Sequence, residues 1–103
     1  MGERERRGDA IRQFERFVEK YPTDPRYTPD AMFRLAELYY ERSAVEYDDA
    51  SKEYNIQKAL YDRGKVPERP KSPVRGYDDV VQTYLTLIKR FGDTYRYADA
   101  VYY

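Results

Sequence analysis

One apolar pattern occurs twice in this chain, and that duplication limits what the chain can fold into more than any single residue does. Six apolar residues recur 70 positions later with unchanged spacing, and Asp9 recurs with them as Asp79. The six pairs are Ala10 with Val80, Ile11 with Val81, Phe14 with Tyr84, Phe17 with Leu87, Val18 with Ile88, and Tyr21 with Phe91. Copied units are typical of repeat architectures, in which each unit buries its apolar face against a neighbour. We therefore expect the function to reside on a surface rather than in a pocket.

A second shared stretch follows each apolar set, with one residue lost between its two halves. Its members are Arg26, Tyr27, Asp30 and Ala31 in the first copy and Arg96, Tyr97, Asp99 and Ala100 in the second. The copied segment thus extends past one helix into the start of the next. Because the chain ends at Tyr103, inside that next helix, we expect it to be a piece of a longer protein.

Composition narrows the class of protein. The 103 residues allow at most one small domain, and 37% charged with 41% hydrophobic residues is the balance of a soluble, foldable chain. Lys plus Arg equals Asp plus Glu at 19 each, so the general basic field used by nucleic-acid-binding proteins is absent and we do not expect such a partner. The sequence also has no apolar run of the roughly 18 residues needed to cross a bilayer.

The spacing of apolar residues predicts helices over residues 9–21, 30–63 and 77–91, and the start of another at 99. Asp9 is a candidate N-cap for the first, and Pro22 and Gly92 end the two copied helices. The segment 30–63 contains neither Gly nor Pro, which favours one long helix ended by Gly64. An alternative places a turn near Tyr47, because the sequence there resembles the start of the third helix. Nothing predicts a strand.

The stretch between the copies has two further features. Tyr40, Tyr47, Tyr54 and Tyr61 recur every seven residues and form a stripe suited either to packing or to a partner. The connector that follows contains three prolines and four basic residues with a single acid, which predicts an irregular solvated linker. The basic residues are Lys65, Arg69, Lys71 and Arg75.

These residues carry a resemblance to tetratricopeptide repeat (TPR) proteins that covers most of the chain. Ala10, Phe14, Phe17 and Pro22 have the spacing of the second helix of such a repeat, although the family prefers Ala where Phe17 stands. Leu35, Ala36 and Tyr39 resemble the core of the first helix of the next repeat. The offset of 70 is about twice the family's period, so the middle segment is either an elongated helix or a degenerate repeat.

The loop from Tyr21 to Ala31 resembles the junction in bacterial envelope members, such as outer-membrane-assembly lipoproteins and Tol-Pal coordinators. The resemblance implies an all-α fold of antiparallel helical hairpins, an α-solenoid fragment forming one module over residues 1–103, and a periplasmic or outer-membrane-associated location. It also implies a partner-binding face. Carried onto this sequence, that face comprises Phe33, Arg34, Glu37, Tyr40 and Glu41, and Tyr47 of the tyrosine stripe extends the candidate set. The family's clamp for a carboxylate tail is absent, because Phe33 and Glu37 stand at its positions.

We expect no enzymatic activity, no cofactor and no metal. The chain has neither His nor Cys, and it lacks a Gly-rich phosphate loop or a metal-binding motif. Its acidic cluster, Glu46, Asp48, Asp49 and Glu53, lacks the spacing of a calcium loop. The leading hypothesis is a protein–protein interaction scaffold whose partners are other proteins or further repeats of its parent chain. The alternatives are a self-assembling structural module, hence a homo-oligomer, and contact of the basic connector with anionic lipid or nucleic acid.

Overall fold

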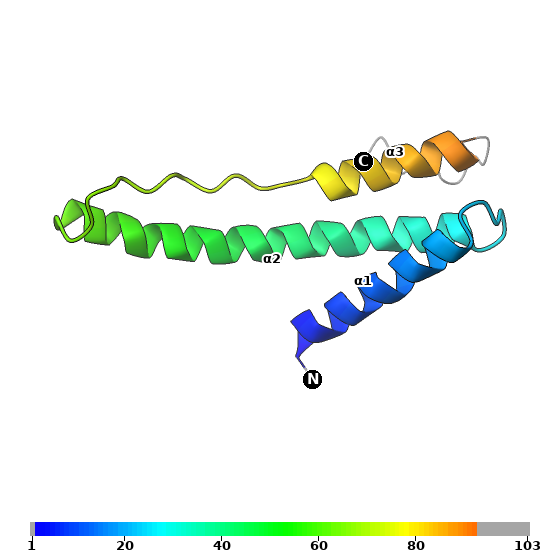
Figure 1. Ribbon diagram of the computed structural model, residues 1–103, viewed down its shortest axis with the longest axis horizontal. Coiled ribbons are helices and arrows are strands. Elements are labelled where there is room, and N and C mark those ends of the chain that lie inside the picture. The colour runs from blue at the N-terminus through cyan, green and yellow to red at the C-terminus, as the bar shows by residue number, and fades with distance from the viewer. Residues whose placement is uncertain (1, 93–103) are drawn as a thin grey trace. The chain divides into compact units, whose positions relative to one another are not determined.

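The computed structural model describes residues 2–92, which form three helices: α1 (Glu3–Lys20), α2 (Thr28–Asp62) and α3 (Asp78–Phe91) (Figure 1). No strand occurs within these residues, which confirms the all-α prediction. The chain divides into two compact units. Of the described residues, the first unit comprises 2–41 and 77–92, and the second comprises Arg42–Gly76. The predicted helix start at Asp99 lies outside the described residues.

Helix α1 begins at Glu3, earlier than the predicted start at Asp9. The added turn is rich in charge, with Glu3 and Glu5 at the positive end of the helix dipole. Arg7 supports it through an ion pair with Glu3 one turn back, at 3.6 Å between Nη2 and Oε1. Asp9 is therefore inside the helix, where it pairs with Arg12, and Gly2 occupies the N-cap position.

Helix α2 is continuous from Thr28 to Asp62 and has no turn near Tyr47. Its start is anchored by Thr28, which is fully buried and whose hydroxyl donates a hydrogen bond to the carbonyl of Tyr21. Its end has the two hydrogen bonds of a Schellman motif, from Lys65 N to Leu60 O at 2.8 Å and from Gly64 N to Tyr61 O at 2.9 Å. Gly64 has a φ of 72°, the left-handed conformation that this motif requires and that glycine adopts without a steric penalty.

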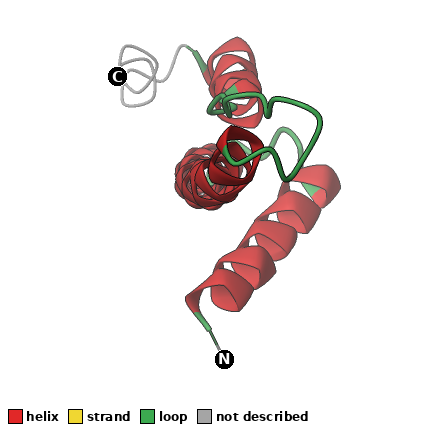
Figure 2. Cartoon of the chain, turned by 90° about the vertical axis from the view of Figure 1, so that its left-hand side faces the viewer, coloured by secondary structure: helices red, strands yellow, loops and turns green. Residues whose placement is uncertain are grey.

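The core of the first unit lies on two sides of α2. On one side Ile11 of α1 packs with Leu35 and Leu38. On the other, Leu87 and Phe91 of α3 pack with Met32. Figure 2, which looks nearly along α2, shows α1 and α3 on these different sides. Both copies of the duplicated pattern are thus helices that bury part of their apolar set against the same central helix.

The second unit consists of the rest of α2 and the proline-rich connector. The connector runs extended beside this part of α2 (Figure 1), a course suited to Pro67, Pro70 and Pro73 because proline donates no backbone hydrogen bond. Near its end, Arg75 Nε donates a hydrogen bond of 3.3 Å to Oγ of the buried Ser43.

Candidate protein interaction surface

The five residues implied as a partner-binding face lie together on one stripe of α2 in the first unit. We name this stripe the α2 ridge; it comprises Phe33, Arg34, Glu37, Tyr40 and Glu41. Four of them are exposed and Phe33 is half-buried. The residues on the opposite side of the same turns are buried, namely Met32, Leu35, Ala36 and Leu38. The helical period therefore separates a packed side of α2 from an open one.

The charged residues of the ridge form a short network that reaches α1. Arg34 Nη1 lies 3.7 Å from Glu37 Oε1 and 3.8 Å from Glu41 Oε1. Arg7 of α1 approaches Glu41 from the other direction, at 3.6 Å between Nε and Oε2. The two pairs of Arg34 are solvent-exposed, and exposed ion pairs contribute at most about 1 kcal/mol each to stability. Their main effect is to hold two carboxylates and two guanidinium groups in a fixed order on the surface.

On the side facing α3 the ridge borders aromatic rings. Phe33 meets Tyr84 edge to face, with ring centroids 6.1 Å apart, and Tyr40 lies against Tyr77 at 6.2 Å. Burial raises the pKa of the Tyr84 hydroxyl above its ordinary value, and the negative charge of Glu37 raises it further. Charged and aromatic groups of the ridge are thus bordered by Arg7 of α1, by Tyr84 of α3 and by Tyr77 just before α3.

The remaining candidate residues belong to the second unit. Tyr47 is 41% exposed on α2, whereas Lys65, Arg69 and Lys71 are exposed on the connector. Arg75 is half-buried and donates a hydrogen bond to Ser43, so its environment differs from that of the three exposed basic residues.

Three residues that border the ridge were not among the sequence-based candidates: Arg7, Tyr77 and Tyr84. Arg7 could have been found from the Glu3-to-Arg7 spacing, which favours a helix that starts before Gly8. Tyr84 was assigned only to the apolar pattern, and its contact with Phe33 depends on how α3 crosses α2. Tyr77 precedes α3, where the sequence indicated only a helix start.

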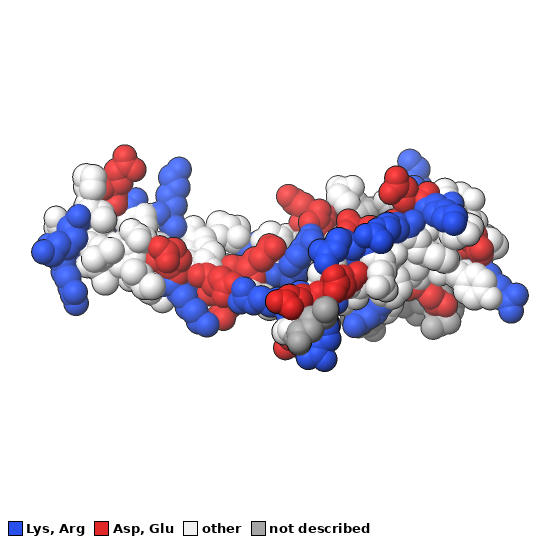
Figure 3. All heavy atoms as spheres, turned by 60° about the horizontal axis from the view of Figure 1, so that its bottom comes forward, with Lys and Arg blue, Asp and Glu red and all other residues white. Residues whose placement is uncertain are grey.

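The charge distribution agrees with the balanced composition. Figure 3 shows Lys and Arg side chains next to Asp and Glu side chains over much of the visible face. Within residues 2–92, no group of three or more acidic side chains is placed to hold a metal ion. No helix in that same range has the length and apolar character needed to cross a membrane.

Comparison with protein family models, curated proteins and solved structures gave no match to this chain.

Proposed function

We propose that this chain is a TPR-like helical interaction module, part of an α-solenoid in a longer bacterial protein, that holds partner proteins in a cell-envelope assembly. One observation carries the proposal: the α2 ridge is open to solvent while α1 and α3 bury the other side of the same helix. A helix fixed by packing on two sides presents its third side in a defined orientation. Binding then costs little additional ordering of the protein.

The chemistry of the ridge suits a protein partner. Tyr40 is 50% exposed, and Tyr and Arg are among the residue types that contribute most to binding energy at interfaces. Arg34 adds a planar donor group, and Glu37 and Glu41 add acceptors next to it. A partner that inserts an apolar side chain beside Tyr40 and a basic side chain between the two carboxylates would complement this surface.

The cell-envelope location rests on the loop between Tyr21 and Ala31 and its resemblance to envelope members of the family. Fractionation of the source cells, with antibody detection of the parent protein, tests it. Recovery in the cytoplasmic fraction would remove this part of the proposal.

The binding proposal is tested by site-specific photocrosslinking. A photoreactive amino acid at Tyr40 should capture a discrete partner band from source cells. The same group at Lys52, which is exposed on α2 in the second unit, serves as the control. Glu37→Lys should reduce the Tyr40 crosslink at least ~10-fold, the change expected for about 1.4 kcal/mol at an interface contact. Equal capture from both positions, or a crosslink unaffected by Glu37→Lys, would contradict binding at the ridge.

Self-association is a second candidate, favoured by the tyrosine stripe in the second unit. Tyr47 and Tyr61 are 41% and 38% exposed, and Tyr54 lies half-buried between them on the same stripe of α2. Sedimentation equilibrium of the purified chain tests this candidate, with Tyr47→Lys/Tyr61→Lys as the variant. A chain that stays monomeric at high micromolar concentration would rule it out.

A further inference from the structure

The two copied helices expose opposite parts of the same apolar set. Ile11 of α1 is 3% exposed, whereas Val81, its counterpart in α3, is 47% exposed. The reverse holds at the other end of the pattern, where Tyr21 is 44% exposed and its counterpart Phe91 is 6% exposed. Helix α2 therefore covers one side of α1 and the other side of α3. Phe14 and Phe17 of α1 remain half-buried, and Phe14 also packs against the cluster of Ile11, Leu35 and Leu38.

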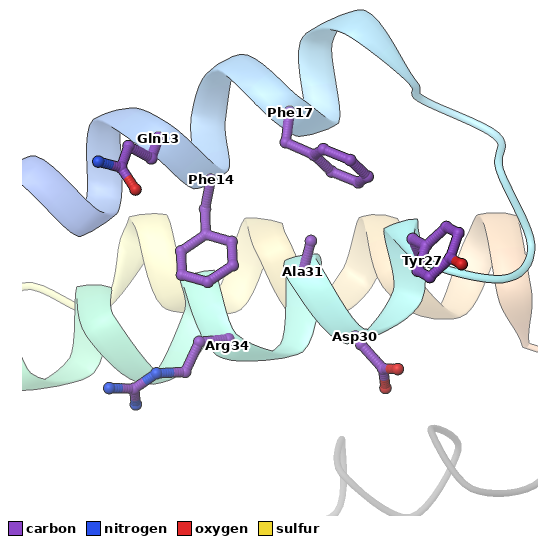
Figure 4. A pocket seen from close by; sticks show the side chains of 7 residues that line it. All are labelled: Gln13, Phe14, Phe17, Tyr27, Asp30, Ala31 and Arg34. Atoms are coloured by element: carbon purple, nitrogen blue, oxygen red, sulfur yellow. The ribbon is translucent and has the colours of Figure 1, made fainter.

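A groove of about 530 Å³ opens beside Phe14 and Phe17, between α1 and the start of α2. Figure 4 shows Phe14 and Phe17 from α1, with Ala31 and Tyr27 from the second wall, facing this space. Phe17 is half-buried, and its nearest ring is that of Tyr21, at 5.2 Å between centroids. The polar side chains of Gln13 on one edge and of Asp30 and Arg34 on the other border this apolar floor.

The duplication indicates what fits this groove. Phe14 and Phe17 correspond to Tyr84 and Leu87 of α3. In α3 these two positions are covered by two consecutive residues of α2. Tyr84 packs on Phe33, and Leu87 packs on Met32 and is fully buried. The wall of the groove on α1 thus repeats a surface that, on α3, already binds a helix.

Charge on the rim of the groove indicates the same occupant. Arg16 and Lys20 follow Gln13 by three and seven residues along α1, and both are exposed. Helical spacing puts them on the α1 edge that Gln13 begins, so this edge is basic. In α2 the apolar pair is followed one and two turns later by Glu37 and Glu41. A helix of this kind brings carboxylates to a basic rim.

We propose that the groove between α1 and α2 binds an amphipathic α-helix of the α2 type, with two adjacent bulky apolar residues and glutamates on the following turns. This inference rests on the proposed function, because it names the chemistry of one partner of a helical interaction module. The apolar pair enters the groove over Phe14 and Phe17. The site is distinct from the α2 ridge, with which it shares only Arg34 on its rim.

The test uses a helix-stapled synthetic peptide with the sequence of residues 28–45, titrated into isotope-labelled protein and followed by NMR. We expect saturable shift changes at the amides of residues 13–17 and 27–34. Phe17→Glu in the protein should weaken binding at least ~10-fold, since it puts a charge on the apolar floor. The matched control is Val81→Glu, an apolar-to-acid change on the uncovered side of α3, which should leave binding unchanged.

Two further variants keep the result interpretable. A peptide carrying Met32→Asp and Phe33→Asp should not bind, and Phe17→Ala replaces Phe17→Glu if the glutamate variant does not fold, as judged by circular dichroism. No binding at millimolar peptide, equal weakening by Val81→Glu, or shift changes centred on Leu87 and Phe91 would overturn the inference. The last result would mean that the peptide displaces α2 from α3. If a partner is still crosslinked at Tyr40 while the peptide does not bind, this inference fails and the proposed function stands.

Discussion

Replacing Leu87 by Ala gives the most direct test of the packing that orients α3 on α2. Leu87 is fully buried against Met32 and Phe91, whereas Leu85, two residues earlier on the same helix, is 50% exposed. Leu→Ala removes three carbon atoms, worth about 2.4 kcal/mol of transfer free energy at full burial. Incomplete collapse of the cavity raises the cost at Leu87 to roughly 3 kcal/mol or more. At Leu85 half of the transfer free energy is lost and no cavity forms, so we expect about 1 kcal/mol.

Urea unfolding followed by circular dichroism measures this difference. With a slope of about 1 to 1.5 kcal/mol per molar urea for a chain of this size, Leu87→Ala should lower the midpoint by ~2 M and Leu85→Ala by under ~1 M. If Leu87→Ala leaves too little folded protein, Leu87→Val should still lower the free energy of unfolding by about 1 kcal/mol. Equal effects at positions 85 and 87 would show that α3 does not pack through Leu87, and the reasoning would fail.

Three other predictions concern single residues. Thr28→Val should lower the free energy of unfolding by about 1 kcal/mol, because the hydrogen bond from the buried hydroxyl to the Tyr21 carbonyl is lost. The control, Thr23→Val in the exposed loop before α2, should change the thermal midpoint little. Gly64→Ala should lower the free energy of unfolding by roughly 1 kcal/mol, because an L-residue is strained at a φ of 72°. Faster hydrogen exchange at the Lys65 amide would report the loss of the helix end. Because the pKa of Tyr84 is raised in the folded state, the folded protein holds the hydroxyl proton more tightly than the unfolded chain does. The contribution of Tyr84 to the free energy of unfolding is therefore fully present below pH 10 and is lost as the pH rises above 10. Wild type should therefore lose stability relative to Tyr84→Phe between pH 9 and 11 in chemical unfolding, and a difference that does not change with pH would contradict the raised pKa.

The elements of this fold could be read from the sequence because their signals are local. Thr28 and Pro29 mark the start of α2, the absence of Gly and Pro keeps it helical, and Gly64 gives the end. The start of α1 was the exception. Gly8 and Asp9 form a plausible helix start, but charge pairing between Glu3 and Arg7 and the favourable dipole at Glu3 extend the helix through them.

The candidate surface was partly predictable for a related reason. Helical period places Arg34, Glu37 and Glu41 on one stripe, so their common exposure follows from α2 alone. The neighbours of the ridge could not be predicted from α2 alone. Arg7, Tyr77 and Tyr84 reach it only through the angles at which α1 and α3 cross α2. Those angles depend on how side chains interlock across helices far apart in sequence.

The sequence by itself determined that two helices of this protein share one apolar pattern, because composition and spacing fix amphipathic helices without reference to any partner. The tertiary structure alone decided which part of the pattern each copy buries. Ile11 is covered and Val81 is exposed, while Phe91 is covered and Tyr21 is exposed, although the residues are copies of one another. The physical reason is that α2 meets a different side of each copy. Corresponding positions of one apolar pattern therefore line a groove on α1 and a packed interface on α3.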